Sequence, residues 1–461
     1  MYGPYSAPGM RTRQSSMFKP KKPVFDRKAM WEPADSDEEE QGGGGTRKEA
    51  PPSAISSAVL PRILNIIPRL RIPYTPDACE AVKELVDITN MTTQDEDELV
   101  GGEGLIEAVV AVLCKGSSSG RVYAAWALGN LAAKVERNRI KVAKQQGALE
   151  ALVAMAASEG EKERGAAARA ILGLSSSRDA ADAMMRADGF VDAVAGLVLK
   201  AKMSTKEDAC KALDVLVANG WHLADAIGSV ESALQALKSS ARSHNCSSRA
   251  RLHSLAALGT LSRCEKLRDT LHRSRVSEDV FLSLLSDDSA GRHSSEMRLL
   301  GTMGAANLLR GPDDDSLVEH GGRVAEMVPA LAATVQMGGA GPRLSRRSGH
   351  LLAALCSAAR NDGLRRVLVG ERALELCMDM VTVAHKQGQR GQCLRQILRF
   401  VLLLSLNDLA RDRMGALDYV SMLRAHTKGP DAGIRRCCAA TLWRLGEKGD
   451  IGVAGAEEGE G

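Results

Sequence analysis

Apolar positions recur along most of this chain with the i, i+3, i+4 spacing of helices that bury one face. One helical phrase, Ala-Ala-Trp-Ala-Leu-Gly-Asn-Leu-Ala-Ala at residues 124–133, returns in degraded form further along. Its echoes lie at residues 167–174, 256–261, 304–309 and 352–357. A helical phrase that returns about every 40–50 residues predicts an α-solenoid, in which each repeat buries its apolar face against its neighbours.

The repeat can be followed helix by helix after the first copy of this phrase. We expect a short helix at residues 138–144, a sharp break at Gly147, and a second helix at 148–156. On the second helix, the spacing of Leu149, Leu152 and Val153 predicts that they face the core. A polar loop at 159–161 then leads into a long helix that carries the next Ala-rich phrase. The chain is therefore predicted to be all-α and built from three-helix units.

The domain organisation follows from the extent of this pattern. Residues 1–52 combine Gly, Ser, Pro and charge blocks and are expected to be a disordered tail, and 450–461 form a second short tail. Residues 53–74 are largely apolar but interrupted by Pro61 and Pro68 within 54–72, which predicts a capping segment, with a detachable docking or membrane-surface segment as the alternative. The repeat domain covers 75–449, with boundaries near 75–116, 117–161, 162–203, 204–246, 247–290, 291–341, 342–390, 391–429 and 430–449.

Three short patterns in the N-terminal tail suggest regulation. Ser16 follows Arg11 and Arg13 as a basophilic kinase site would, and Ser36 precedes an acidic run typical of an acidophilic kinase site. Residues 19–22, Lys-Pro-Lys-Lys, fit a nuclear import signal. All three patterns are short, and the alternative is a solvated tail without these roles.

The cysteine and histidine usage points away from metal sites and catalysis. The 10 cysteines and 9 histidines contain no C-x-x-C pair, no H-E-x-x-H motif and no cluster with metal-ligand spacing. No glycine pattern forms a phosphate-binding loop or a nucleophile elbow. We therefore expect no enzymatic activity, no cofactor and no metal, and reduced thiols in a cytoplasmic or nuclear protein. No apolar run reaches the length of a transmembrane segment.

Charge is distributed unevenly along the chain, whose net charge is only +4. Residues 341–446 hold 18 Lys and Arg against 8 Asp and Glu. The excess includes Arg343, Arg346, Arg347, Arg365, Arg366, Arg395, Arg399, Arg435, Arg436 and Arg444. These residues form either ordinary solvated helix faces or a basic surface for an acidic partner. An aromatic content of 3% makes nucleic acid a weaker candidate than an acidic protein segment, because single strands bind by stacking on aromatic rings.

The three-helix unit resembles the armadillo repeat. The resemblance rests on the phrase at 124–132 followed by Asn138, Ile140 and the run at 147–153, and it extends loosely over 75–449. It implies a right-handed superhelix of about eight three-helix repeats whose third helices line a concave groove. In that family an Asn on each third helix holds the backbone of a bound peptide, and a Trp one turn earlier forms an apolar wall for basic side-chain stems.

Carrying these two positions through the repeats shows how far the resemblance extends. The Asn position holds Asp87, Asn130, Gly173, Val215, Thr260, Asn307, Ser357, Ser405 and Arg444. The Trp position holds Lys83, Trp126, Arg169, Lys211, Ala256, Met303, Ala353 and Val401. Only one Trp–Asn pair is present, which counts against a nuclear-import receptor with an array of such pairs. An armadillo-type nucleotide-exchange factor for the seventy-kilodalton heat-shock chaperone stays as a second alternative.

The sequence thus predicts a non-enzymatic protein-binding scaffold or adaptor that captures a partner segment in the concave groove of the solenoid. The predicted groove residues are Trp126, Asn130, Asn307, Arg395, Arg399 and Arg444. The arginines would supply charge to an acidic or phosphorylated segment. Nucleic acid is not the expected partner.

Overall fold

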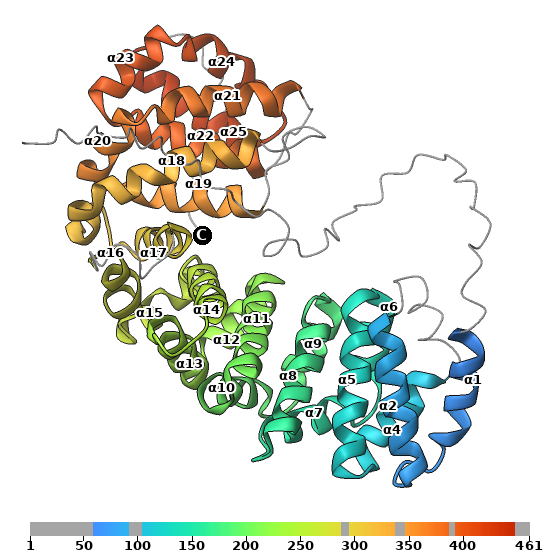
Figure 1. The fold of residues 1–461 in the computed structure, drawn as a ribbon. Coiled ribbons are helices and arrows are strands. Elements are labelled where there is room, and N and C mark those ends of the chain that lie inside the picture. Colours follow the sequence, from blue (N-terminus) through green and yellow to red (C-terminus); the bar gives the residue numbers. More distant parts are fainter. Residues whose placement is uncertain (1–58, 92–103, 287–294, 337–345, 387–391, 448–461) are drawn as a thin grey trace, which may run out of the picture. The chain divides into compact units, whose positions relative to one another are not determined.

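The computed structural model describes residues 59–91, 104–286, 295–336, 346–386 and 392–447. Throughout these ranges the chain is helical and contains no β-strand, which confirms the predicted all-α class (Figure 1). The tail that carries Ser16 and Ser36, and the expected tail at 450–461, lie outside the described residues. None of the helices in the described ranges is both long and apolar enough to cross a membrane.

The predicted three-helix unit is confirmed by α6 (Glu136–Lys144), α7 (Ala148–Ala156) and α8 (Glu161–Ser175). Gly147 precedes α7 with a φ of 81°, a left-handed conformation that L side chains rarely adopt. Leu149 and Leu152 are buried as expected, whereas Val153 is half-buried. Two later repeats make the same turn without glycine. Arg372 precedes α21 (Ala373–Lys386) and Asp418 precedes α24 (Tyr419–His426), and they have φ values of 63° and 55° at this junction.

The same order of helices continues along the chain. The first helices of the units are α6, α9 (Arg178–Arg186), α12 (Trp221–Gly228), η1 (Glu265–Leu267) with α15 (Arg268–Arg273), η3 (Asp315–His320), α20 (Asp362–Gly370) and α23 (Asp408–Ala416). The second helices are α4 (Leu105–Lys115), α7, α10 (Phe190–Lys200), α13 (Glu231–Arg242), η2 (Ser277–Leu282) with α16 (Ser283–Ser286), α18 (Gly321–Gln336), α21 (Ala373–Lys386) and α24 (Tyr419–His426). The third helices are α2 (Pro76–Met91), α5 (Ser118–Lys134), α8, α11 (Met203–Ala218), α14 (Ser248–Leu261), α17 (Ser295–Asn307), α19 (Arg346–Ala358), α22 (Gln392–Leu404) and α25 (Ala432–Arg444).

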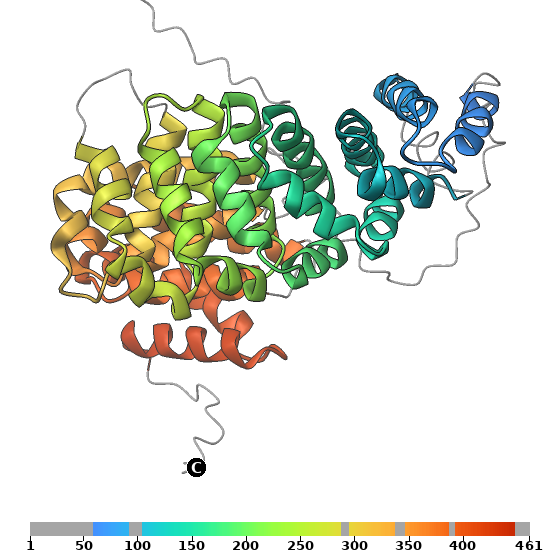
Figure 2. The same ribbon diagram turned by 90° about the horizontal axis from the view of Figure 1, so that it is seen from below.

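The third helices form one continuous row, in which each packs against the next from α2 to α25. Neighbouring repeats follow one another in colour order in Figures 1 and 2. The helices α5 and α8 come closest at two glycines, since a Cβ added to Gly173 would lie 2.7 Å from the carbonyl oxygen of Gly129. The small residues of the repeated phrase are therefore needed for close stacking, and Ala124, Ala125 and Ala127 are fully buried.

The ends of neighbouring third helices are linked by polar side chains. At the start of α8, Glu161 accepts hydrogen bonds from the backbone N–H of Lys202 at 3.0 Å and from the hydroxyl of Thr205 at 3.1 Å. Glu163 of the same helix accepts from the hydroxyl of Ser118 at 2.9 Å. These carboxylates join α8 to α11 and to α5, and they occupy N–H groups and hydroxyls at helix N-termini that have no partner within their own helix.

The N-terminal helix α1 (Val59–Arg69) packs on α2 and includes both prolines of the apolar segment. Pro61 lies in the first turn, where a proline costs no helical hydrogen bond, and Pro68 lies inside the last turn, one residue before the end. One helix therefore spans both prolines, and the interruption expected from the sequence is not seen. Ile63 and Ile66 are buried against the repeat domain. Arg69 binds Asp77 at 2.8 Å and Glu84 at 3.1 Å, which fixes α1 to α2.

Candidate binding surface on the third helices

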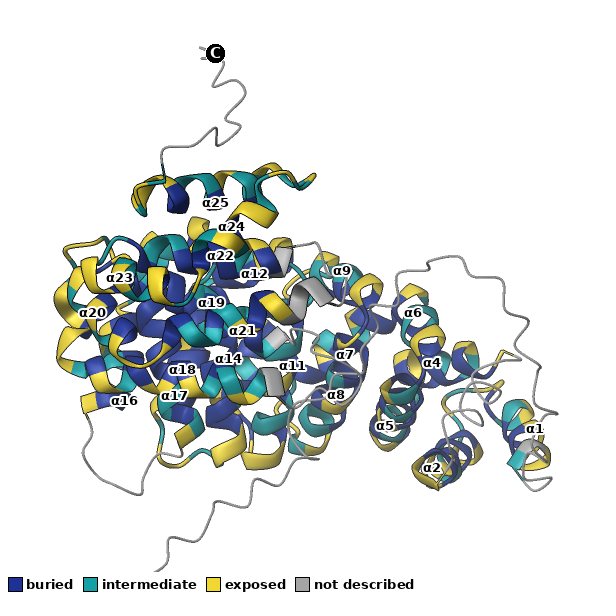
Figure 3. Cartoon of the chain, turned by 90° about the horizontal axis from the view of Figure 1, so that it is seen from above, coloured by how far each residue is buried: buried dark blue, intermediate teal, exposed yellow. Residues whose placement is uncertain are grey.

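The outward face of the third-helix row is defined by what these helices do not bury. The inner members of the row each pack against both neighbours and against a second helix. Exposed residues remain along α2, α5, α8, α11, α22 and α25, whereas residues 250–261 of α14, 296–307 of α17 and 347–358 of α19 include none. Figure 3 colours the helices by burial. On four consecutive helices the position matched to the family's Trp is exposed, and it holds Lys83, Trp126, Arg169 and Lys211. One aromatic ring and three long cationic side chains therefore lie on this face.

The later repeats do not keep that register. The matched residues Ala256 and Met303 are each 7% exposed, and Val401 is fully buried. On α22 the exposed residues are instead Arg395 and Arg399. The position matched to the family's Trp is thus exposed in the first four third helices, whereas in α22 the nearest exposed residue lies two positions before the matched one.

Trp126 is partly exposed on the third-helix row and is in contact with a second aromatic ring. Its side chain is 37% exposed, and its ring meets that of Tyr123 edge to face, with the centroids 5.9 Å apart. This contact holds the indole in one orientation, and its free surface can carry an apolar side chain or the stem of a Lys or Arg.

Asn130 is only partly available to a partner. Both hydrogens of its amide are used, because Nδ2 donates to Oγ1 of Thr89 at 3.1 Å and to Oδ1 of Asn90 at 3.0 Å. Its Oδ1 oxygen is left to accept a hydrogen bond from a peptide N–H. Asn130 can therefore act as an acceptor, but it cannot hold a peptide backbone by donor and acceptor together unless it releases α2.

Asn307 is placed inside the stack, which corrects its assignment to the groove. It is 5% exposed, and its Nδ2 donates to the hydroxyl of Ser262 at 3.1 Å. Asn219, which the sequence did not single out, makes the equivalent bond to the carbonyl of Ser175 at 2.5 Å. Asparagines at the ends of third helices thus link neighbouring repeats, since an amide can donate across the short gap between two helix ends.

Arg395 is engaged within the protein. Its guanidinium lies 2.6 Å from Oδ2 of Asp431, whose other oxygen accepts from the N–H of Ile434 and caps the start of α25. The hydrogen bond from Arg395 holds the pKa of Asp431 below its ordinary value, and the same bond raises the pKa of Arg395. Arg395 therefore joins α22 to α25 and is a weaker candidate for a partner than its neighbour Arg399.

Several other arginines of the basic stretch cap helices. Arg365 is buried and donates to the carbonyls of Ala359 and Arg360 at 2.8 and 3.0 Å, and it pairs with Asp362 at 2.7 Å. Arg139 makes the same three interactions with Ala132, Ala133 and Glu136 in an earlier repeat. An acidic residue followed three residues later by Arg thus marks the helix that satisfies the end of the preceding third helix.

Arg399 and Arg444 are exposed and have no partner among the described residues. Burial raises the pKa of Cys356 on α19 and of Cys437 on α25, and the charge of Arg399 on α22 opposes this rise at both thiols. Burial raises the pKa of Cys356 to about 12, so this thiol stays protonated and inert at neutral pH.

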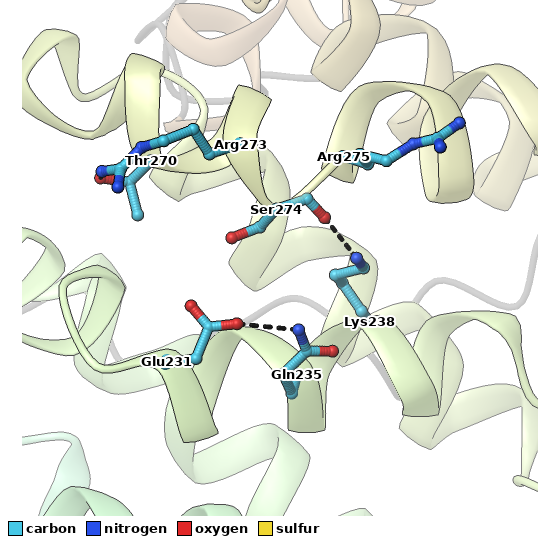
Figure 4. A pocket seen from close by; sticks show the side chains of 7 residues that line it. All are labelled: Glu231, Gln235, Lys238, Thr270, Arg273, Ser274 and Arg275. Carbon is cyan, nitrogen blue, oxygen red and sulfur yellow. Dashed lines mark hydrogen bonds between the residues drawn. The ribbon is translucent and has the colours of Figure 1, made fainter.

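Two recesses of the described surface are lined mainly by polar residues. One of about 290 Å³ is lined by Glu231, Gln235, Lys238 and residues 270 and 273–275, and its polar groups bind one another (Figure 4). Lys238 donates to the carbonyl of Ser274 and lies 3.3 Å from Asp279, while Gln235 donates to Glu231 at 2.8 Å. Among the residues that the structure describes, no group of three His, Cys, Asp or Glu side chains could hold a metal ion.

Comparisons with known proteins support the fold. No protein-family model matches the chain, and no curated protein matches it. An engineered protein of known crystal structure is similar, with a TM-score of 0.61 and 18% identity over 83% of this chain and 88% of its own. A designed armadillo repeat protein matches with a TM-score of 0.47 and 17% identity over 53% of this chain and 99% of its own. Another, solved in complex with the peptide (KR)4, matches with a TM-score of 0.47 and 16% identity over 53% of this chain and 99% of its own.

Proposed function

We propose that this chain, an armadillo-type solenoid in its fold, is a non-enzymatic scaffold or adaptor that binds an extended segment of a partner protein along its third helices. The observation that carries the proposal is the exposed line of Lys83, Trp126, Arg169 and Lys211 on four consecutive third helices. Exposed aromatic and cationic side chains on a rigid, repeated framework are typical of a recognition surface.

Capture would take place at equilibrium, without a covalent step. A segment lying across the row passes one third helix after another, so each repeat contributes a small share of the affinity. Trp126 would provide an apolar wall beside the segment, and Oδ1 of Asn130 would accept from its backbone. The framework carries little ordering cost, because neighbouring third helices are already linked by Glu161, Glu163 and Asn219.

We place this function in the cytoplasm or nucleus. The described cysteines are all free, including Cys437 and Cys438, which are adjacent in the chain. Free thiols at several depths of the core support a reducing compartment.

The proposal is tested by selecting binders from a random peptide display library against the full chain. Their affinities are then measured for the wild type and for Trp126→Ala/Asn130→Ala/Arg444→Glu. A matched control, Trp221→Ala/Asn65→Ala/Arg366→Glu, removes the same side-chain types from exposed positions on α12, α1 and α20. Circular dichroism must show that all three proteins are equally folded.

We expect the selected peptides to lose at least about fivefold in affinity with the first variant, since two or three contacts of about 0.5–1 kcal/mol each, together about 1–3 kcal/mol, are removed. The control should bind as the wild type does. Equal binding by both variants, or a library that yields no binder, would contradict the proposal.

A further inference from the structure

The last three third helices are three consecutive members of the row without an acidic residue, a property that α5 and α14 share singly. Together α19, α22 and α25 contain seven arginines and no Asp or Glu. The first third helix, α2, shows the opposite balance, with the four acids Asp77, Glu80, Glu84 and Asp87 and the single cation Lys83. Three consecutive members of the row thus form its basic end.

Five acidic residues in this part of the chain are already paired with arginines. Asp431 binds Arg395, Glu296 binds Arg347 at 3.6 Å, and Asp362 binds the buried Arg365. Asp408 and Glu447 likewise pair with Arg411 and Arg424. Two of these carboxylates thus neutralise Arg395 and Arg347 of the basic end, and the other three pair with arginines outside the three helices, so none of the five neutralises the remaining arginines.

Four exposed arginines are left without a side-chain partner among the described residues: Arg399, Arg436 and Arg444, and Arg360 directly after α19. We call these four residues the arginine face. Keeping like charges close together without counter-charges disfavours the folded protein, so the arrangement favours an anionic partner.

The contacts between the helices bring these arginines onto one surface. Sγ of Cys356 on α19 lies 3.8 Å from the carbonyl of Gln396, one turn before Arg399 on α22. The charges of Arg360 and Arg399 both act on Cys356, and that of Arg399 also acts on Cys437 of α25. Arg444 follows Cys437 by about two helical turns and lies on the same side of α25, whereas Arg436, directly before Cys437, lies about 100° around the helix from it.

An apolar anchor lies next to this charge. Trp443, adjacent to Arg444, is 70% exposed, which is a high value for an indole. It is the single exposed aromatic side chain on the three helices, because Phe400 is buried and α19 has none. Three repeats with one ring do not offer the succession of stacking platforms that single-stranded nucleic acid uses, so a protein segment fits better.

The geometry of the row also sets the spacing of the partner's charges. Packed helices are about 8–10 Å apart, and an extended chain advances about 3.3–3.4 Å per residue. A segment lying across α19, α22 and α25 therefore meets a new helix about every third residue.

We propose that the arginine face binds an extended acidic protein segment in which a carboxylate or phosphate recurs at about every third residue. The inference rests on the proposed function and specifies the partner's chemistry at one end of the row. Arg399 and Arg444 would contact successive anionic groups through their paired N–H donors, and Trp443 would cover an apolar side chain between or beside them.

The test uses fluorescence anisotropy with the full chain and two labelled peptides of equal composition. One carries a glutamate at every third position, and the other carries the same glutamates in one block. The variant Arg399→Glu/Arg444→Glu is compared with Arg366→Glu/Lys428→Glu, which makes the same change in net charge at exposed, unpaired positions outside the third helices.

We expect the spaced peptide to bind the wild type more tightly than the blocked one, and to lose at least tenfold in affinity with Arg399→Glu/Arg444→Glu. The control variant should stay within about twofold, because screening over about 8 Å removes distant charge effects at physiological salt. Equal losses in both variants would overturn the inference, as would equal affinity for the two peptides. Tighter binding of a single-stranded oligonucleotide than of either peptide would also overturn it.

The result separates this inference from the proposed function. If the library-selected peptides bind the third helices but neither acidic peptide binds, the chemistry assigned to the arginine face is wrong and the scaffold function stands. If neither kind of peptide binds, both are wrong.

Discussion

The stacking of α5 on α8 gives the most quantitative test of how the repeats pack. In Gly173→Ala the new Cβ would lie 2.7 Å from the carbonyl oxygen of Gly129 and 3.4 Å from its Cα. Both neighbours are backbone atoms, so the strain can be relieved only if the two helices move apart. Overpacking of this kind costs about 1–3 kcal/mol, and the better helix propensity of alanine returns about 0.5–1 kcal/mol. The difference is a net loss of about 0–2.5 kcal/mol, and we expect a value in its upper half because the 2.7 Å contact is with backbone.

The repeated phrase provides the matched control. Gly259 has the same place in its Ala-Leu-Gly phrase as Gly129, yet a Cβ built there meets no atom within 4 Å. Gly259→Ala should therefore stabilise the protein by about 0.5–1 kcal/mol. The two changes are chemically identical and differ only in how closely the next repeat approaches.

Native-state hydrogen exchange is the suitable assay, because repeat proteins can open locally and a single midpoint would average over the chain. Amides of α5 and α8 should lose protection in Gly173→Ala, and those of α14 should gain protection in Gly259→Ala. A Gly173→Ala protein as stable as the wild type in α5 and α8 would refute the close approach. Loss of protection in both variants would show that the closeness of the neighbouring helix does not decide whether a Gly→Ala change stabilises or destabilises the protein.

Three further changes test other parts of the account. Asp418→Gly should raise the free energy of unfolding in urea by about 1 kcal/mol, because glycine adopts the left-handed backbone conformation of this position without strain. A loss of stability would contradict the strain assigned to this turn. Arg365→Ala should lower the free energy of unfolding by about 1–3 kcal/mol, because it leaves helix-end carbonyls without a donor. Arg366→Ala, at the exposed neighbouring position, should change it by no more than about 0.5 kcal/mol. Equal effects of the two changes would contradict the capping role of Arg365. Burial raises the pKa of Glu161, but its bonds from Arg164, the Lys202 N–H and Thr205 outweigh it and lower the pKa below the ordinary value of 4.5. The ionised Glu161 therefore stabilises the folded protein fully above the ordinary pKa, and this stabilisation disappears as the pH falls through the lowered pKa of the folded state. In Glu161→Gln the free energy of unfolding, measured in urea at a series of pH values, should fall less steeply toward acid pH. An unchanged fall would contradict the role given to Glu161.

The local pattern of the sequence was enough to predict the fold. Residues 148–156 were predicted as a helix and form α7 with the same bounds, because Gly147 and the apolar spacing are local signals. The Asp362–Arg365 spacing is local too, so the capping arginines could have been found from the sequence. They were instead grouped with the exposed arginines of the basic stretch.

The binding surface could be predicted only in part, because it depends on contacts between repeats. Trp126 was predicted to face a partner and is exposed. Arg395 meets Asp431 from the next repeat, and Asn307 meets Ser262 from the previous one, and no spacing within one helix reveals either pairing. Whether a polar side chain on a third helix faces a partner or its neighbour is decided by the distance between repeats.

Hydrogen exchange of the full chain with and without a library-selected peptide tests the central claim most directly. The account predicts new protection confined to the third helices, including α5 at Trp126, with the first helices α9 and α12 unchanged. Protection that appears on the first and second helices, with the third helices unchanged, would contradict the claim that this chain recognises its partner along the third-helix row.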